Sequence, residues 1–444
     1  MVRYIRGLGL IGVLLLLSGY RLPRASLPMA APGQALIGLR EGSGLPMAMT
    51  GAVQEAIPAL GIWLLRVPPG KEAATVAELR RRPDVIFAEL NDRVQAVAAF
   101  PNDPGWSQQW GMHKIAAAEA WAITRGTPEV IVAVVDSGTQ LSHPDLQDGL
   151  WRNAAEIPDN GLDDDANGKV DDVWGWHFYQ HWDGQTFIPM EDNAVADDYG
   201  HGTHVAGIVG ARIDNEVGVA GVVGGVTVMI VKVLNQYGDG WASDVAQGMV
   251  YAVDNGARVV VLSLGASQPS EVMRAAVTYA QRQGVLVVAA TGNTGGSVLY
   301  PAAEPYALAV AATDSRDARA SFSNHGPAVD LAAPGVNIYS TGFHSDYLVK
   351  SGTSMAAPHV AGAAALIWSA YPHLSAAQVT HALTSTAQDV NGGTLLLPGW
   401  DEYLGWGRLD VAAALRAARR TVYPATLFLS IVTKNHPGNA PAAR

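Results

Sequence analysis

The sequence contains no cysteine among its 444 residues. Disulfide bonds, thiolate metal sites and cysteine nucleophiles are therefore excluded, and stability must come from packing or from cations bound through oxygen. Charged residues make up only 16% of the chain, and no basic run is longer than the three arginines at residues 80–82. With 29 basic and 40 acidic residues the formal net charge is −11, which argues against nucleic-acid binding.

Long apolar runs are also scarce, and the clearest one, residues 7–19, follows Arg3 and Arg6. This length fits the hydrophobic region of a signal peptide and is short for a membrane span. We therefore expect residues 1–30 to be a signal peptide and the protein to be secreted or extracytoplasmic. An uncleaved N-terminal anchor remains the alternative, because no Ala-x-Ala cleavage site follows directly. No other stable membrane span is predicted.

Residues 31–100 have the pattern of a small separate unit. Apolar segments at 34–40, 61–67 and 85–90 predict strands, and residues 72–82 have helical spacing. Residues 1–100 carry 11 basic and 7 acidic side chains, net +4, which leaves 18 and 33, net −15, for residues 101–444. Opposite charge favours association of the two pieces.

The whole chain is 49% hydrophobic, and the part after residue 100 is long enough for a large core. Buried strands alternate with helical stretches, which predicts an α/β fold: a mostly parallel sheet with helices on both faces, preceded by a small α+β module. Functional side chains are expected where the strands end. The expected strands are residues 130–135, 228–234, 258–264 and 285–290, and the expected helices are residues 242–254 and 271–283.

Ser354 lies in the small-residue turn Gly-Thr-Ser-Met-Ala-Ala-Pro, directly before an apolar helix. At a helix N-terminus, backbone N–H groups and the positive end of the dipole face any oxyanion that forms there. A serine nucleophile also needs a base and an acid that orients the base. His201, flanked by glycine, and Asp136, after an apolar strand, are the candidates. Each alone would be a common cap, turn or structural residue, so the prediction depends on their combination.

The chain order Asp136, His201, Ser354 is that of subtilisin. With the motifs around these residues, the chain resembles the subtilisin-like serine proteases of the subtilase family, especially its thermitase-like branch, over residues 102–418. The resemblance implies a serine endopeptidase that hydrolyses peptide bonds through an acyl-enzyme. It also implies that residues 31–100 are an inhibitory propeptide that assists folding and is cut off by self-processing, the alternative being a retained N-terminal domain.

The resemblance further implies that Asn293 donates to the oxyanion alongside the backbone N–H of Ser354. Leu299 matches a position in the primary specificity pocket where smaller residues often stand, so we expect a shallow pocket and small or medium apolar residues at the cleaved position. The substrate backbone is expected to pair as an added strand with two edges of the cleft. The residues of these edges are Gly238, Gly240, Ser263, Leu264 and Gly265.

Residues 163–172 include five carboxylates among ten positions, a density that predicts structural Ca²⁺. Trp174 stands where an EF-hand has glutamate, which argues against a helix–loop–helix site. Asp145 matches the region of a further calcium site, with Asp214 or Asn215 as a second ligand. The ligands expected in the loop are Asp163, Asp165, Asn167, the carbonyl of Lys169, and Asp171.

Two other functions stay open from the sequence: a narrow processing protease with the same triad, and an inactive calcium-binding or adhesion module with this fold. An acid peptidase of the sedolisin type is disfavoured because His201 stands where its carboxylate base would be. The expected partners are protein or peptide substrates and the chain's own propeptide, with the enzyme a monomer. Residues 419–444 fall outside the family pattern and have no predicted role.

Overall fold

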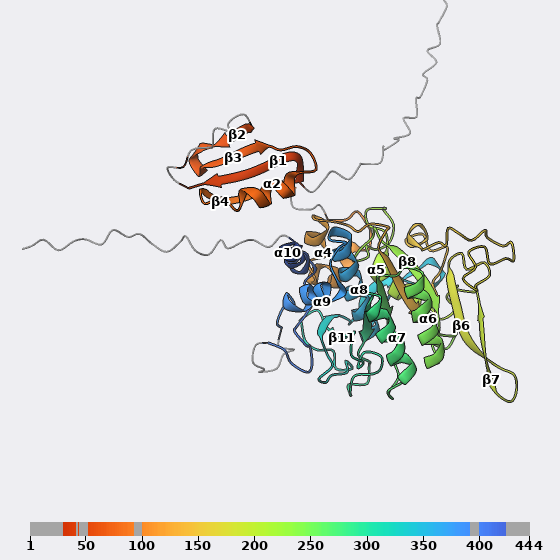
Figure 1. Cartoon of the computed structure of the whole chain (residues 1–444). Helices are drawn as coiled ribbons and strands as arrows, with labels where there is room; N and C mark the ends of the chain where they lie inside the picture. Colours follow the sequence, from red (N-terminus) through yellow and green to blue (C-terminus); the bar gives the residue numbers. More distant parts are fainter. Residues whose placement is uncertain (1–29, 41–42, 44–51, 93–99, 391–398, 423–444) are drawn as a thin grey trace, which may run out of the picture. The chain divides into compact units, whose positions relative to one another are not determined.

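A computed structural model describes residues 30–40, 43, 52–92, 100–390 and 399–422 (Figure 1). Residues 1–29 of the expected signal peptide and residues 423–444 of the C-terminal segment lie outside these ranges. The chain divides into two compact units, residues 1–96 and 97–444. Among the described residues, no helix combines the length and apolar character needed to cross a bilayer.

The smaller unit is one antiparallel sheet covered by a helix. Its strands occur in the order β2-β3-β1-β4, and helix α2 (Glu72–Leu79) buries Val76 and Leu79 against them. The strands are β1 (Ala30–Leu39), β2 (Val53–Ile57), β3 (Ile62–Arg66) and β4 (Val85–Asp92). Strand β2 was not expected from the sequence, because four of its five residues are exposed and it has no continuous apolar face.

The larger unit is organised around an eight-stranded sheet of order β12-β11-β10-β9-β5-β8-β6-β7. All neighbouring pairs are parallel except β6 and β7, which form an antiparallel hairpin. The strands are β5 (Ile131–Asp136), β6 (Gly175–Trp182), β7 (Phe187–Asp192), β8 (Thr227–Lys232), β9 (Val259–Leu262), β10 (Leu286–Ala290), β11 (Ala307–Thr313) and β12 (Leu331–Pro334).

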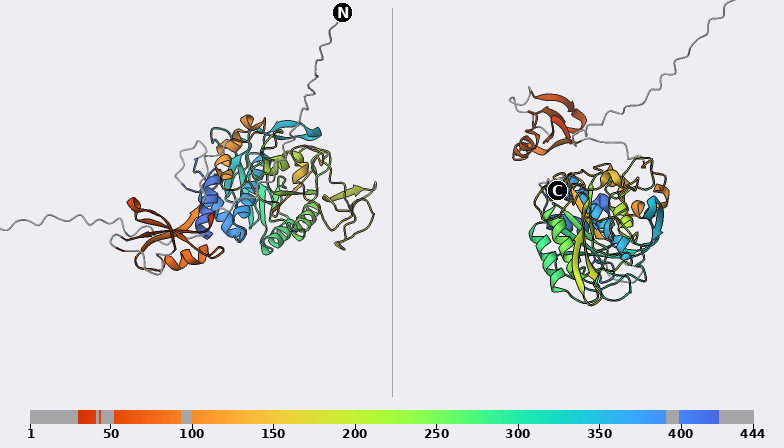
Figure 2. Two further views of the ribbon diagram at one scale, coloured as in Figure 1. Left: turned by 90° about the horizontal axis from the view of Figure 1, so that it is seen from above. Right: turned by 90° about the vertical axis from the view of Figure 1, so that its right-hand side faces the viewer.

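Helices cover both faces of this sheet (Figure 2). Successive side chains of a strand point to opposite faces, so the hydrophobic core is divided into two layers. On β5, Val132 and Val134 pack into the layer under α5 (Gly202–Gly210) and α8 (Thr353–Ala370). Ala133 and Val135 pack into the opposite layer, under α6 (Ala242–Asp254) and α7 (Glu271–Arg282). This is the period of two expected for strands buried on both faces.

The remaining elements complete the layer of α5 and α8. The helices are α3 (Trp110–Lys114), α4 (Ala117–Trp121), α9 (Ala376–Ser385) and α10 (Val411–Val422), and a separate antiparallel pair is formed by β13 (Ile338–Thr341) and β14 (Tyr347–Lys350). The predicted fold class, with its mostly parallel sheet, two helical faces and preceding α+β module, is confirmed.

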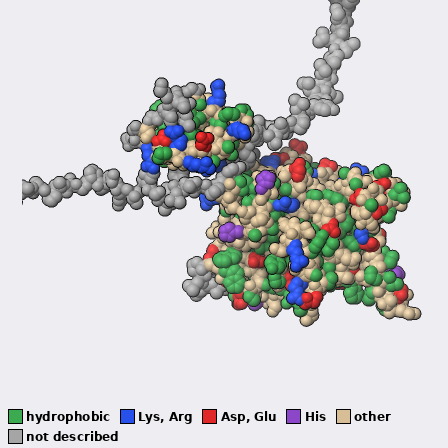
Figure 3. Space-filling view, in the orientation of Figure 1, with side chains coloured by type: hydrophobic (Ala, Val, Ile, Leu, Met, Phe, Trp, Pro, Cys, Tyr) green, Lys and Arg blue, Asp and Glu red, His purple; other side chains and the backbone are tan. Residues whose placement is uncertain are grey.

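The β6–β7 hairpin was not predicted. It projects from the body of the larger unit in Figure 1 and in the left view of Figure 2, and hydrophobic side chains are visible on this projecting part in Figure 3. Every residue of β7 from Phe187 to Glu191 is exposed, so the strand lacks the buried apolar alternation by which a sequence reveals a strand.

Candidate active site

The predicted catalytic residues lie at the end of one strand and at the start of two helices, all at the carboxyl edge of the sheet. Asp136 is the last residue of β5, His201 immediately precedes α5, and Ser354 lies in the first turn of α8. Gly202 permits the close approach of α5 to β5, because a Cβ atom there would lie 2.1 Å from the carbonyl oxygen of Gly138. Any larger residue after the histidine would separate the two elements.

Asp136 and His201 form a direct pair. Nδ1 of His201 lies 2.8 Å from Oδ1 and 3.0 Å from Oδ2 of Asp136, whose carboxylate is fully buried. Oδ1 also accepts a hydrogen bond from the backbone N–H of Ser137 at 2.7 Å. Because an ionised carboxylate only accepts, this contact assigns the ring proton to Nδ1 and leaves Nε2 able to accept a proton.

Ser354 forms two hydrogen bonds with Ser263, the residue that follows β9. Its hydroxyl donates to the Ser263 carbonyl at 3.1 Å, and the Ser263 hydroxyl donates back to the Ser354 carbonyl at 2.8 Å. Among the hydrogen bonds of the described residues, none joins the Ser354 hydroxyl to His201. Nucleophile–base contacts are often long or misaligned without substrate, and rotation about one side-chain bond re-aims this hydroxyl.

Asn293 is tied to the residue before the serine. Its side-chain oxygen accepts hydrogen bonds from the backbone N–H of Thr353 at 2.8 Å and from the Thr353 hydroxyl at 2.9 Å. Both contacts use the amide oxygen, so they orient the side chain with its NH₂ group left to donate beside the start of α8. That orientation is the one a donor to an oxyanion requires.

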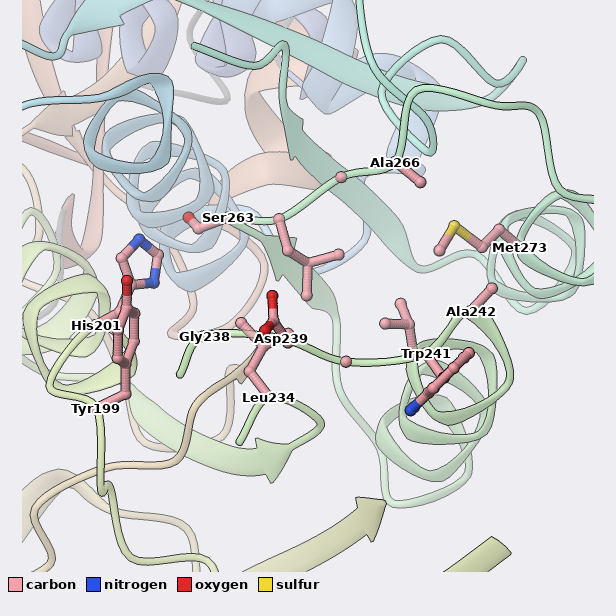
Figure 4. Close-up of a pocket in the computed structure, with 14 residues that line it drawn as sticks. Tyr199, His201, Leu234, Gly238, Asp239, Trp241, Ala242, Ser263, Ala266 and Met273 are labelled. Carbon is pink, nitrogen blue, oxygen red and sulfur yellow. The ribbon is translucent and has the colours of Figure 1, made fainter. Parts of the chain in front are cut away.

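A pocket of about 320 Å³ adjoins His201 and contains all five residues expected to bind the substrate backbone (Figure 4). His201 and Tyr199 lie at one end of the view, and Trp241, Ala242 and Met273 lie at the other. The five expected residues in its lining are Gly238, Gly240, Ser263, Leu264 and Gly265.

Leu299 does not line this pocket. It packs beside Gly265 and Gly292, where added Cβ atoms would lie 3.0 Å from its Cβ and 2.7 Å from its Cγ, respectively. Its backbone N–H donates to the carbonyl of Thr291 at 2.9 Å, two residues before Asn293. Leu299 therefore occupies the space between the end of β10 and the Ser263–Gly265 segment.

Asp197 was not selected from the sequence, yet it organises the segment before His201. Its carboxylate accepts hydrogen bonds from the backbone N–H groups of Tyr199, Gly200 and Thr203 and from the hydroxyls of Ser137 and Thr203, at 2.6–3.1 Å. The available signal was an aspartate shortly before a glycine and a helix start, the usual place for a capping carboxylate.

Two lysines form hydrogen bonds to the backbone in the same region. The buried Nζ of Lys232 donates to the carbonyls of Ser137 and Leu234 and to Asp198 at 2.6–2.9 Å. Nζ of Lys350 donates to the Gly200 carbonyl at 2.8 Å. Burial lowers the pKa of Lys350, an effect that Asp197 partly opposes.

The second histidine of the His-Gly-Thr-His motif has a different environment. His204 is buried within α5, and its Nε2 lies 3.2 Å from the carbonyls of both Ile338 and Leu348. Burial, assisted by the charge of Lys350, lowers its pKa to about 3. A neutral, enclosed ring bonded to backbone carbonyls has a structural role and is not available as the base.

The acidic loop, residues 163–172, contributes to a cluster of carboxylate oxygens that differs from the predicted set of ligands. Carboxylate oxygens of Glu156, Asp165 and Asp172 lie within 4.8 Å of one another, and Glu156 and Asp172 are buried. Burial raises the pKa of Asp172, and the charge of Asp165 adds to this effect. Of the predicted ligands, only Asp165 belongs to this group, which we name the acidic triad.

The other predicted ligands in the loop make local contacts. Asp163 accepts from the backbone N–H groups of residues 167 and 168, and Asp171 accepts from those of residues 160 and 161. The Asn167 amide donates to Asp165 and Asp172 at 3.1 Å each. Lys169, predicted as a ligand through its carbonyl, forms an ion pair with Glu191 through its side chain.

Asp145 lies in a second acidic environment with Asp103, which the sequence analysis did not select. Both residues are buried, and burial together with the Asp103 charge raises the pKa of Asp145 to about 6. The Asn215 amide donates to Asp145 at 2.7 Å, whereas Asp214 forms an ion pair with Arg125. Of the two alternatives considered with Asp145, the structure brings Asn215 to it.

Comparison with known proteins places these motifs in one family. The model of the subtilase family matches residues 127–407. Thermitase of Thermoactinomyces vulgaris is 41% identical over 294 residues, which are 66% of this chain and 93% of that protein. Subtilisin DY of Bacillus licheniformis is 46% identical over 236 residues, 52% of this chain and 82% of that protein.

A thermophilic serine proteinase of Bacillus sp. (strain AK1) is 37% identical over 344 residues, which are 77% of this chain and 75% of that protein. These matches cover 75–93% of each relative, and the matched residues of the family model include Asp136, His201 and Ser354. The resemblance seen in the sequence is confirmed: the chain belongs to the subtilase family and is a subtilisin-like serine endopeptidase.

Proposed function

We propose that Asp136, His201, Ser354 and Asn293 carry out peptide hydrolysis. The observation that carries this proposal is the contact of Nδ1 of His201 with the buried Asp136 carboxylate, at the edge where α8 presents Ser354. The ring is thereby held with Nε2 as the acceptor. When substrate arrives, the Ser354 hydroxyl turns from the Ser263 carbonyl to Nε2.

In the reaction, Ser354 Oγ attacks the peptide carbonyl while His201 takes its proton, and Asp136 stabilises the resulting imidazolium. The carbonyl oxygen becomes an oxyanion that receives hydrogen bonds from the Asn293 amide and the Ser354 backbone N–H. His201 returns the proton to the leaving amine. Water, deprotonated by the same histidine, then releases the acyl-enzyme.

The substrate backbone lies as an added strand between Gly238–Gly240 and Ser263–Gly265. Support comes from the pocket, which these two segments line together next to His201. Leu299 fills the space beside Gly265 and Gly292 and limits the depth available to the side chain at the cleaved position. The enzyme therefore takes small or medium apolar residues there.

The protein is made as a secreted, self-processed precursor. Residues 1–30 direct export, residues 31–100 form the propeptide, residues 101–418 form the catalytic domain, and residues 419–444 have no assigned role. The α+β fold of residues 30–92 and the net charges of +4 and −15 in the two parts support this division. The chain's own propeptide and other polypeptides are thus its partners.

Calcium stabilises the folded enzyme at two places. Three carboxylates brought within 4.8 Å, two of them buried, repel one another unless a cation lies among them, and carboxylate and amide oxygens are the ligands Ca²⁺ prefers. The acidic triad, with Asn167 beside it, would hold one ion. Asp103 and Asp145, with Asn215, would hold the other.

Replacement of the nucleophile tests the assignment of the triad. The wild-type enzyme is expected to react with a fluorophosphonate probe, and Ser354→Ala is expected to abolish labelling and lower kcat by about 10⁶-fold, the loss measured in subtilisin itself. Mass spectrometry of labelled protein locates the modified residue. Labelling at another serine, or none in the correctly folded wild type, would exclude the mechanism and favour an inactive module.

Asp197 is expected to act as a positioning residue for His201. An amide oxygen accepts fewer hydrogen bonds than a carboxylate, so Asp197→Asn should loosen residues 199–203 and lower kcat about tenfold to a hundredfold with KM unchanged. Steady-state kinetics and the rate of fluorophosphonate labelling measure this.

The matched control is Asp183→Asn, which alters a carboxylate that accepts two backbone N–H groups in the hairpin turn. This variant should retain the wild-type kcat. A thermal shift for Asp197→Asn without any kinetic change would assign Asp197 a purely structural role.

Leu299 is expected to set the residue accepted at the cleaved bond. The wild type should cleave peptides with alanine or leucine there faster than the matched phenylalanine peptide. Leu299→Gly should raise kcat/KM for phenylalanine at least tenfold relative to alanine, because removing the isobutyl group opens the space beside Gly292. A strong phenylalanine preference in the wild type would contradict the proposal.

Chelation is expected to lower the melting temperature. A ligand present at about a thousand times its Kd stabilises the folded state by about 4 kcal/mol, which EGTA would remove. Asp165→Asn and Asp145→Asn should each reduce the difference between melting in Ca²⁺ and in EGTA, whereas the exposed control Glu129→Gln should not. Identical melting of wild type in both buffers would exclude both sites.

A further inference from the structure

Three aromatic side chains form an exposed row where the β6–β7 hairpin meets the start of α6. The ring centroids of Trp182 and Phe187 lie 4.9 Å apart, and those of Phe187 and Trp241 lie 4.8 Å apart. Despite these contacts the residues remain 52%, 47% and 48% exposed, respectively. We name Trp182, Phe187 and Trp241 the aromatic row.

The register of the hairpin explains how the row forms. Trp182 pairs directly with Phe187, so both side chains lie on the same face of the hairpin. Gln180 shares that face, two residues earlier, and its amide donates to Asp244 of α6 at 2.7 Å. The face is thereby directed towards the first turn of α6, where Trp241 precedes the helix.

The row is continuous with the pocket beside His201. Trp241 belongs to both: its ring packs against Phe187 in a tilted arrangement, and it lines the pocket together with Leu234 and Ala242. In Figure 4 it lies at the end of the pocket away from His201. A chain that fills the pocket and continues in the same direction therefore meets the aromatic row next.

We propose that the aromatic row is a docking site for the substrate polypeptide beyond the residues held in the pocket, and that it selects apolar or aromatic side chains there. The inference rests on the proposed function, because it requires that the substrate occupies the pocket. An endopeptidase acts within a chain, so its substrate has residues that continue past the pocket. Covering half-exposed rings with such residues removes apolar surface from water and lowers the free energy of the complex.

The charges around the row favour this occupant over a lipid surface. Asp239 lines the adjoining pocket and Asp183 lies in the turn of the hairpin, whereas Glu191, on the row's own face, is paired with Lys169. Acidic side chains repel an anionic bilayer, whereas they accept an apolar segment flanked by neutral or basic residues. The row thus acts as a specificity site for long substrates.

Substrates of two lengths separate this role from a structural one. Matched peptides with one scissile sequence are compared: a short peptide that fills only the pocket, and longer peptides that carry phenylalanine or serine beyond it, at either end. The wild type should cleave one phenylalanine-extended series about tenfold more efficiently than its serine counterpart, by kcat/KM. Trp182→Ala and Phe187→Ala should remove this advantage, mainly through KM, and leave the short peptide unaffected.

The control is Trp406→Ala, because Trp406 is 49% exposed and so matches the exposure of the row. Its backbone N–H donates to the carbonyl of Asp330, next to β12 at the opposite edge of the sheet. It should change none of these rates. Equal losses on short and long peptides would make the row a structural anchor, and no advantage of phenylalanine in either wild-type series would overturn the inference. Binding to vesicles that depends on Trp182 and Phe187, without the peptide effect, would assign the row to membranes instead.

These outcomes remain distinct from a failure of the proposed function. If the wild type does not cleave the short peptide, and substitution of Ser354 does not alter labelling, the catalytic assignment fails. If the short peptide is cleaved through Ser354 and the extensions have no effect, only the docking site fails. Cleavage of short peptides is therefore measured first.

Discussion

The buried carboxylate of Asp136 imposes a constraint that the surrounding structure must meet. An ionised group without solvent is costly unless hydrogen-bond donors surround it. The Ser137 backbone N–H and the His201 ring supply these donors, and the ring reaches Asp136 because Gly202 lets α5 approach the end of β5. The same contact that satisfies the carboxylate therefore orients His201, the proposed base, so stability and the proposed catalysis depend on one interaction at this edge.

That interaction depends on a second layer of bonds around the segment before His201. Asp197 gathers three backbone N–H groups and two hydroxyls, while Lys232 and Lys350 hold carbonyls on either side. One of those hydroxyls belongs to Ser137, which also accepts from the Gly202 backbone N–H. The segments that carry Asp136 and His201 are thus joined twice, once through the Asp136 carboxylate and once through the Ser137 hydroxyl.

The sequence predicted the parts of this arrangement that have local patterns. Apolar, Val-rich runs identified β5, β8, β9 and β10, whereas the buried, Ala-rich β11 and β12 were not predicted. The surroundings of Asp136, His201 and Ser354 were visible as short motifs. The β6–β7 hairpin was missed because its outer strand is exposed throughout. The convergence of Glu156 and Asp172 with Asp165 was not predicted for another reason: carboxylates that meet across a folded loop have no fixed spacing in the sequence, so only coordinates reveal which of them converge.

The acidic loop and the aromatic row contact the same elements, so the proposed calcium site is linked to the proposed docking site. Tyr251 of α6 donates to Asp172 at 2.6 Å, and Lys169 pairs with Glu191 of β7 while its Nζ lies 5.2 Å from the ring centroid of Phe178 in β6. The loop thus contacts β6, β7 and α6, the elements that carry or adjoin the row. An ion that rigidifies the loop also restrains the hairpin, and a restrained hairpin loses less conformational entropy when a substrate covers its rings.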